Sequence, residues 1–182
     1  MYQPIINNKT MKRFFATAII LLIGLALYAQ EKTQYNFFAQ EGDVVWQKVF
    51  PTELDATAVF TAIKTSGALT DITETESVLV GSLVERKPEY SSMGYRRGDV
   101  PLFVLQSTGG FAKVEMREGR YRVTINKLYR IDDTERSPKR VDFTFYVNKK
   151  GELRFFPERA QEIFDYNFTK MFEAKSKVEE DW

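Results

Sequence analysis

Two segments in the second half of the chain alternate apolar and polar residues in the manner of strands with two different faces. In residues 121–131 the apolar positions are Tyr121, Val123, Ile125, Tyr129 and Ile131, and the polar positions are Arg122, Thr124, Asn126 and Arg130. In residues 141–148 the apolar positions are Val141, Phe143, Phe145 and Val147, and the polar positions are Asp142, Thr144, Tyr146 and Asn148. Because successive side chains of a strand point to opposite faces, this pattern predicts an antiparallel sheet with one face covered by helices and the other open to water.

Other segments complete a predicted α+β order. Strands are expected over residues 44–50, 100–106 and 111–117, as one or two strands within 68–86 broken near 74–77, and as a short last strand at 153–156. Helices are expected from Glu53 to Thr65, with Thr52 and Asp55 as a capping box, and from Pro157 onward, where apolar residues recur at helical spacing. Gly109-Gly110 is interpreted as a hairpin turn.

The predicted fold class is α+β, with an antiparallel curved sheet of about five to seven strands backed on one face by two helices. The expected chain order is β-α-β-β-β-β-α. The alternative is a small antiparallel β-barrel-like domain with a C-terminal helix.

The N-terminal segment has the pattern of a secretory signal peptide. Lys12 and Arg13 form a basic start, residues 16–27 are apolar, and Ala29 supplies a small residue at the cleavage position. The apolar run is shorter than the roughly 20 residues that a spanning helix needs, so no stable membrane span is expected after cleavage. Translation is expected to start at either Met1 or Met11.

The expected localisation is therefore periplasmic or extracellular, without a lipid anchor because the chain has no cysteine. The domain prediction is a leader and signal peptide over residues 1–29, an N-terminal lead-in over 30–42, a single α+β domain over 43–173 and a charged tail over 174–182. Cleavage removes three of the 26 basic residues against 25 acidic ones and changes the net charge from +1 to −2. This near-neutral balance gives no reason to expect nucleic acid as a partner.

Catalytic chemistry finds little support in the composition. The chain has no histidine and no cysteine, which excludes Ser-His triads, thiol nucleophiles and the usual zinc sites. The adjacent pair Asp132-Asp133 lies in an expected turn beside basic residues, where solvation explains it. We expect no enzyme activity, no metal site and no cofactor.

The expected element order, together with the run Gly119-Arg120-Tyr121-Arg122-Val123-Thr124-Ile125 and the Gly-Gly-Phe sequence at 109–111, resembles a known family. The chain is similar over residues 43–172 to exported bacterial domains of unknown function with a TATA-box-binding-protein-like fold. The resemblance implies a helix-backed curved sheet and brings no catalytic residues. The loop at 87–99 is where this chain is expected to depart from that family.

The leading functional hypothesis is a noncatalytic binding module that recognises a protein, peptide or glycan of the cell envelope. The candidate residues lie on the polar sheet face and on the long loop at its rim: Arg122, Thr124, Asn126, Asp142, Thr144 and Tyr146 on the face, and Tyr90, Tyr95, Arg96 and Arg97 on the loop. The first alternative is a structural component of an envelope complex that pairs through an edge strand. The second is a carboxylate-based hydrolase, which would need two acids converging in a cleft.

Overall fold

The computed structural model describes residues 34–134 and 136–174 of the 182-residue chain. The expected signal peptide lies outside these residues. The helices and strands are, in chain order, β1 (Phe37–Gln40), β2 (Asp43–Pro51), α2 (Ala56–Thr65), β3 (Leu69–Glu74), β4 (Val78–Leu83), β5 (Thr108–Arg117), β6 (Arg120–Asp132), β7 (Lys139–Asp142) and α3 (Glu158–Phe172). Four short 3-10 turns lie between them: η1 (Ser91–Met93), η2 (Arg97–Asp99), η3 (Leu102–Leu105) and η4 (Phe143–Tyr146).

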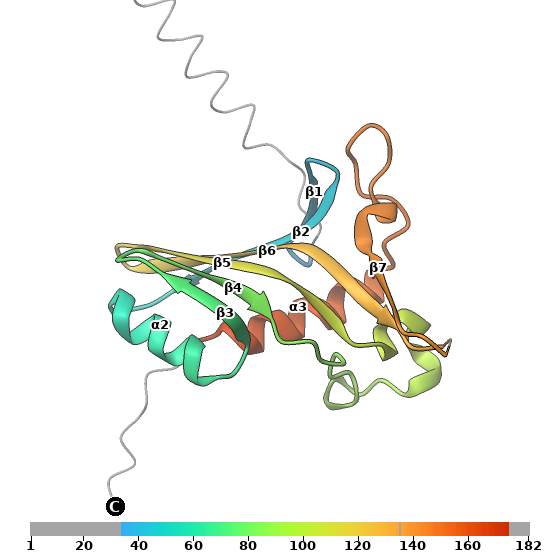
Figure 1. Ribbon diagram of the computed structural model, residues 1–182, viewed down its shortest axis with the longest axis horizontal. Coiled ribbons are helices and arrows are strands. Elements are labelled where there is room, and N and C mark those ends of the chain that lie inside the picture. The colour runs from blue at the N-terminus through green and yellow to red at the C-terminus, as the bar shows by residue number, and fades with distance from the viewer. Residues whose placement is uncertain (1–33, 135, 175–182) are drawn as a thin grey trace, which may run out of the picture. The chain divides into compact units, whose positions relative to one another are not determined.

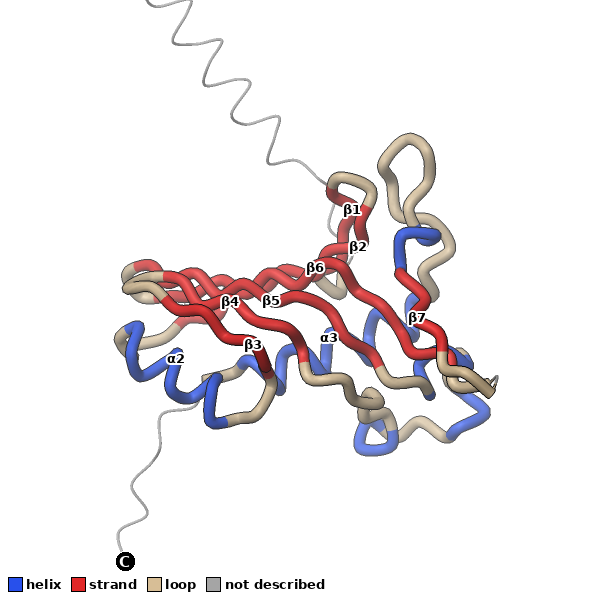
Figure 2. Tube along the Cα trace, viewed as in Figure 1, coloured by secondary structure: helices blue, strands red, loops and turns tan. Residues whose placement is uncertain are grey.

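All strand pairs are antiparallel and form one open sheet. The order is β1-β2-β6-β5-β4-β3, and β7 pairs with the far end of β6. Within the described residues β1 and β3 are edges that do not pair with each other, so the sheet is not closed and the β-barrel alternative is wrong. Figures 1 and 2 show α2 and α3 on the same side of the sheet. The predicted α+β class, a helix-backed antiparallel sheet, is confirmed.

The core fills the space between the sheet and the two helices. Apolar side chains at alternate positions of β2, β5 and β6, such as Trp46, Val114 and Val123, join Phe60 of α2 and Phe164 of α3 in one cluster. All five are at most 1% exposed. Neither of the two described helices covers the opposite sheet face, as the alternation of residues 121–126 predicted.

The helix α2 begins three residues later than predicted. Its N-cap is Asp55, whose side chain accepts a hydrogen bond from the Ala58 amide at 2.8 Å. Thr52 accepts from the Leu54 amide instead, at 3.1 Å, and stabilises the turn that follows β2. The expected start at Glu53 was therefore wrong, because Asp55, expected as the partner of Thr52 in a capping box, is itself the N-cap.

Buried and partly buried hydrogen bonds fix α3 to the sheet at two places. The Trp46 indole donates to the Asp165 carboxylate at 2.7 Å, and the side-chain amide of Asn36 donates to the same oxygen at 2.9 Å. Near the C-terminal end of the helix, the Tyr121 hydroxyl donates to the Phe172 carbonyl and accepts from the Ala174 amide. The helix therefore has a defined position along β2 and β6.

The strand β6 contains an irregularity after which the opposite set of alternate side chains points to the core. The register with β5 shifts between Gly109 and Phe111, and Lys127 adopts a positive φ of 50°. Leu128 is then buried at 3% exposure, although the strict alternation predicts Tyr129 for the core face. The expectation that Tyr129 and Ile131 continue the apolar face was wrong because a β-bulge adds one residue to the strand.

Gly109-Gly110 lies inside β5 and is not the predicted hairpin turn. A Cβ on Gly109 would lie 2.5 Å from Cζ of the Tyr129 ring, and one on Gly110 would lie 3.1 Å from the Asn126 carbonyl oxygen. The ring of Tyr129 is held from two other sides, since its hydroxyl donates to Glu85 at 2.8 Å and the Arg140 guanidinium lies 3.7 Å from its centroid. These glycines permit the ring and the bulged strand to approach β5 closely.

Replacing Gly109 with alanine is expected to lower the free energy of unfolding by about 1–3 kcal/mol, because the new methyl group displaces a ring that has little freedom to move. The matched control is Gly98→Ala, whose Cβ would meet nothing within 4 Å and which we expect to change stability by less than about 0.5 kcal/mol. Urea unfolding followed by circular dichroism measures both. Equal stability of the two variants would contradict the close approach of Tyr129.

Of the predicted strands, 100–106 is absent from the described residues, 141–148 is present only as its first two residues in β7, and 153–156 is reduced to the single bridge between Val147 and Leu153. In residues 100–106 the chain forms the 3-10 turn η3 directly after Pro101. Within η3, Val104 is buried and Leu102 is 82% exposed. Residues 141–148 leave the sheet after Asp142 and continue as the 3-10 turn η4. In η4 the residues Phe143 and Tyr146 are buried, with a spacing of three instead of two.

Candidate functional site

The sheet face that neither described helix covers, here called the open face, carries a polar depression of about 350 Å³. The central strands β2, β5 and β6 form its floor, and the turn between β1 and β2 forms one side. The lining residues, here called the sheet-face site, are Gln40, Glu41, Asp43, Val45, Gln47, Phe111, Lys113, Glu115, Arg122, Thr124 and Asn126. Three of the predicted site residues, Arg122, Thr124 and Asn126, lie together in this site.

One part of the floor is a charged triad. Glu115 of β5 accepts from Arg122 of β6 at 2.7 Å, and its other oxygen lies 2.9 Å from the Lys113 ammonium group. Glu115 and Arg122 are directly opposite each other in the β5–β6 register. The two cations therefore share one carboxylate, and the triad has one net positive charge.

The triad keeps the Glu115 carboxylate ionised. Partial burial acts to raise the pKa of Glu115, but hydrogen bonds and charge from Lys113 and Arg122 outweigh it, and the pKa is lowered overall. A carboxylate held in this way is a poor proton donor near neutral pH, so the triad has the properties of a binding element and not of a general acid.

Glu115→Gln is expected to lower the free energy of unfolding at pH 7 by about 1 kcal/mol, a small value because Lys113 is 46% exposed and solvent screens its charge. A lowered folded-state pKa means that the stabilisation is present above the unfolded pKa and is lost as the pH falls through the folded value. The difference between wild type and variant should therefore shrink between pH 7 and pH 3. Urea unfolding at both values measures it, with the exposed turn variant Glu118→Gln as control. A difference that grows toward pH 3 would contradict the assigned direction.

The remainder of the floor consists of uncharged hydrogen-bonding groups. The Gln47 amide donates to the Thr124 hydroxyl at 3.1 Å. Asn126 has a side-chain oxygen that is buried and makes no hydrogen bond within the described residues. Phe111 lies opposite Asn126 in the register and remains 38% exposed, so it presents a ring beside the amides.

Two carboxylates stand at the side of the sheet-face site. Glu41 lies in the turn between β1 and β2, where it has a φ of 52° and Gly42 a φ of 84°, and Asp43 is the first residue of β2. Neither side chain is ion-paired in the part of the chain that the structure describes. With the triad included, the site carries three acidic and two basic side chains, a balance that favours neutral or cationic ligands.

The other predicted face residues lie elsewhere, because residues 143–146 do not form a strand. Asp142 ends β7 and pairs with Arg140 at 3.0 Å. Thr144 is exposed on η4. Tyr146 is 6% exposed, and burial raises the pKa of its hydroxyl to about 12. None of these three lines the sheet-face site.

The loop at 87–99 does not form the rim of the open face. The side chain of Asn167 on α3 holds it, accepting from the Glu89 amide and donating to the Glu89 carbonyl, both at 2.8 Å. The Tyr95 hydroxyl donates to Glu162 of α3 at 2.6 Å. Since α3 covers the opposite side of the sheet, the loop residues and the sheet-face residues are separate groups.

The four loop residues predicted as site residues differ in exposure: the two tyrosines are partly buried and the two arginines are exposed. Tyr90 and Tyr95 are half-buried and pack against the core, and the Arg159 guanidinium lies 5.2 Å from the Tyr95 ring. Arg96 and Arg97 are exposed. The aromatic residues of this loop therefore stabilise its attachment to α3 and present little contact surface to a partner.

Sequence reasoning missed several members of the sheet-face site. Lys113 and Glu115 occupy the polar positions of residues 111–117, so the alternation of that strand contains the signal. Gln47 occupies a polar position of β2 in the same way. Asp43, the first residue of β2, shares the face of Gln47 and carries the same signal, whereas Glu41 lies in the β1–β2 turn, outside the alternation.

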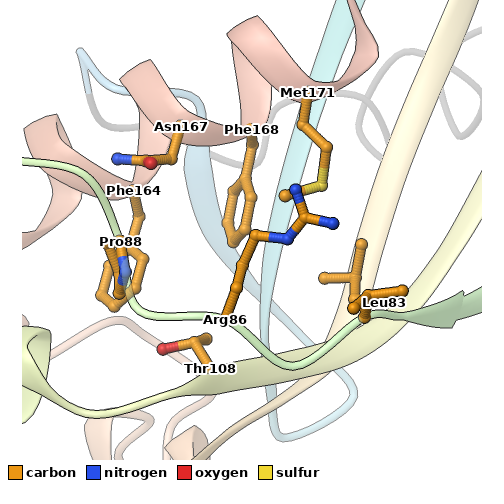
Figure 3. A pocket seen from close by; sticks show the side chains of 9 residues that line it. Leu83, Arg86, Pro88, Thr108, Phe164, Asn167, Phe168 and Met171 are labelled. Carbon is orange, nitrogen blue, oxygen red and sulfur yellow. The ribbon is translucent and has the colours of Figure 1, made fainter. Parts of the chain in front are cut away.

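A second cavity lies on the helix side of the sheet, between α3 and the segment that follows β4 (Figure 3). Its volume is about 20 Å³, and apolar groups of Leu83, Phe168 and Met171 supply much of its wall. The Thr108 hydroxyl in its wall is buried and has no hydrogen-bond partner within the described residues. A space of this size admits a water molecule and nothing larger.

The described residues contain no group of three or more acidic, histidine or cysteine side chains placed to hold a metal ion. A separate search of the same residues finds no helix with the length and apolarity needed to cross a membrane.

A scan against protein families finds no match for this sequence, and a search of curated proteins finds none either. Among solved structures, the fold is similar to a TBP-like protein from Parabacteroides distasonis, with 11% identity, a TM-score of 0.47, and coverage of 74% of this chain and 94% of that one. It is also similar to a DUF4468 family protein from Bacteroides ovatus, with 12% identity, a TM-score of 0.37, and coverage of 78% and 90%. The first description names the fold type that the sequence resemblance implied. The α+β class assigned above rests on the strand order and the helix positions themselves.

Proposed function

We propose that this chain is an exported, noncatalytic binding module that recognises a polar peptide or glycan on the open face of its sheet. The observation that carries the proposal is the sheet-face site, a depression of about 350 Å³ lined mainly by polar side chains on a helix-free surface. The proposed export depends on the N-terminal sequence pattern alone.

The lining chemistry supports a ligand rich in hydroxyl or amide groups. Gln47, Thr124 and Asn126 offer donors and acceptors in a row across two neighbouring strands. Phe111 adds an exposed ring on which an apolar face of a sugar or side chain can pack. Because Glu41 and Asp43 are not ion-paired in the described chain, strongly anionic ligands are disfavoured at this site.

Assembly through an edge strand has less support. The edge strand β3 has a register shift between Thr70 and Thr73, with Asp71 at a φ of 51°. At the other edge of the sheet lies β1, which has only four residues. Bulges and short lengths are the devices that prevent pairing with other chains.

The proposal is tested by titrating isotopically labelled protein with cell-envelope oligosaccharides and with extended uncharged or cationic peptides, and following the backbone amides. A ligand at the sheet-face site should shift the amides of Gln47, Lys113 and Thr124. Thr124→Trp fills the depression and should abolish the shifts while the fold is retained. Arg117→Trp, at the β5–β6 turn outside the lining, is the control. A ligand whose binding survives Thr124→Trp would overturn the assignment.

A further inference from the structure

A second surface, distinct from the sheet-face site, lies on the hairpin formed by residues 145–155. Val147 and Leu153 form an isolated antiparallel bridge, and the Asn148 amide donates to the Glu152 carbonyl at 2.9 Å. The Asn148 side chain also accepts from the amides of Lys150 and Glu152, at 2.8 and 3.0 Å. Figure 1 shows this segment as the loop that follows β7 and projects from the body of the domain. It is called the basic hairpin below.

Two exposed aromatic rings lie at the base of the basic hairpin. Continuing the register outward from Val147 and Leu153 leads to Phe145 and Phe155, which are 57% and 87% exposed. Their chain neighbours Tyr146 and Phe156 are each 6% exposed, and their rings are in tilted contact with centroids 4.8 Å apart. The hairpin is therefore anchored by its inner rings, and its outer rings face solvent.

The φ of Phe155 is 56°, a region that bulky residues rarely adopt. The ring is not held there by burial, since it is the most exposed large apolar side chain among the described residues. Exposure of an apolar ring of this size has a cost in water that contact with an apolar surface would remove.

Positive charge is concentrated in the stretch of sequence that contains these rings. Residues 139–155 contain five basic side chains, Lys139, Arg140, Lys149, Lys150 and Arg154, and two acidic ones, Asp142 and Glu152, so their net charge is 5 − 2 = +3. The whole chain has a net charge of only +1. Lys149, Lys150 and Arg154 are exposed and form no ion pair with other described residues.

We propose that the basic hairpin binds the surface of an anionic lipid bilayer, with Phe145 and Phe155 entering the headgroup region and Lys149, Lys150 and Arg154 facing the lipid phosphates. Clustered cations beside exposed aromatic rings are the combination that anionic interfaces attract. The charge complementarity is with the membrane surface, and no spanning segment is involved. This contact would hold the sheet-face site close to a membrane without occupying it.

Two other occupants fit the hairpin less well. A second copy bound symmetrically would place the same lysines against each other, because the two partners of an isologous interface present the same patch. A folded acidic protein would need a matching surface of about 800 Å² per partner, more than a projecting hairpin of this length supplies. A membrane requires no shape complementarity.

The test uses the full chain as the cell produces it, sedimented with vesicles of phosphatidylcholine alone or with about one third phosphatidylglycerol. We expect binding to the anionic vesicles, weakened when salt is raised to about 1 M, where the Debye length is about 3 Å. Lys149→Glu with Lys150→Glu should lower the partition coefficient by ~10-fold or more. Phe145→Ser with Phe155→Ser should lower it by a similar factor.

Matched variants separate the hairpin from other contributions. Arg117→Glu with Arg120→Glu makes the same charge change at the opposite end of β6, and Val49→Ser removes another exposed apolar side chain; both should leave partitioning unchanged. Absence of binding to anionic vesicles, or binding that the hairpin variants do not reduce, would overturn the proposal. So would a concentration-dependent dimer that the Phe145/Phe155 variant abolishes while the wild type ignores vesicles. Because the sheet-face variant Thr124→Trp should still bind vesicles, failure of one proposal leaves the other intact.

Discussion

Trp46→Ala should destabilise the domain by about 3–5 kcal/mol, the range found when a large core aromatic residue is truncated. Trp46 is fully buried, and its ring meets that of Phe168 at a centroid distance of 5.4 Å. Its indole also donates to Asp165 at 2.7 Å, so the truncation both opens a cavity and removes a donor from a partly buried carboxylate. This loss is a large fraction of the roughly 5–15 kcal/mol that a domain of this kind has.

Urea unfolding followed by far-ultraviolet circular dichroism measures the change, because Trp46 is one of only two tryptophans and its own fluorescence disappears with it. Trp46→Phe is the matched variant: it keeps a ring against Phe168 but loses the hydrogen bond, and should cost about 1–2 kcal/mol. If Trp46→Ala costs no more than Trp46→Phe, the packing of β2 on α3 is not as described.

Phe143→Ala should cost a similar 3–5 kcal/mol. Phe143 is 1% exposed, and its ring lies within 5.7 to 6.1 Å of four others, those of Phe103, Tyr146, Phe156 and Phe164. These rings join η3, η4 and α3 at the end of the domain beyond β7. Removing the central ring of this cluster leaves its neighbours without contacts on one side.

Phe145→Ala is the control that makes this prediction specific. A strand over residues 141–148 would place Phe143 and Phe145 on the same buried face, and both truncations would then be costly. In the 3-10 turn Phe145 is 57% exposed, although its ring centroid lies 3.9 Å from that of Tyr146, so its truncation should cost about 1 kcal/mol, well below the loss for Phe143. Equal losses of stability in the two variants would indicate that residues 141–148 form a strand, and would contradict the 3-10 turn η4.

The comparison of these two phenylalanines shows where sequence periodicity fails. The run from Val141 to Asn148 has good strand composition and alternates without interruption, yet the chain leaves the sheet after Asp142. Beyond the β7 pairing, β2 already pairs with residues 120–125 of β6, and burial at a spacing of three lets Phe143 and Tyr146 both enter the aromatic cluster. Tertiary packing, which no local window contains, overrides the local pattern.

The bulge in β6 is a failure of the same kind. Residues 121–126 follow the predicted alternation, so Arg122, Thr124 and Asn126 were correctly placed on the open face. Beyond Lys127 the extra residue of the bulge exchanges the positions that point to the core with those that point to the open face. The glycines at 109 and 110 mark this place in the sequence, but they signal a close approach of strands and were interpreted as a turn.

The candidate site was predictable to the extent that it lies on regular strands. Thr124 and its neighbours on β6 follow from alternation alone, whereas the partnership of Lys113, Glu115 and Arg122 depends on the register between β5 and β6. The attachment of the 87–99 loop to α3 depends on Asn167 and Glu162, more than sixty residues away in sequence. Long-range pairings of this type have no signature in a single chain.

The central claim, that the open sheet face is a recognition surface, is tested most directly by photo-crosslinking in living cells from position 124, at the floor of the sheet-face site. A control variant carries the photo-reactive group at position 117, which is exposed at the β5–β6 turn and lies outside the lining of the sheet-face site. We expect one dominant protein or glycan adduct from position 124, identified by mass spectrometry and absent from position 117. No adduct from position 124, or the same set of adducts from both positions, would contradict the claim.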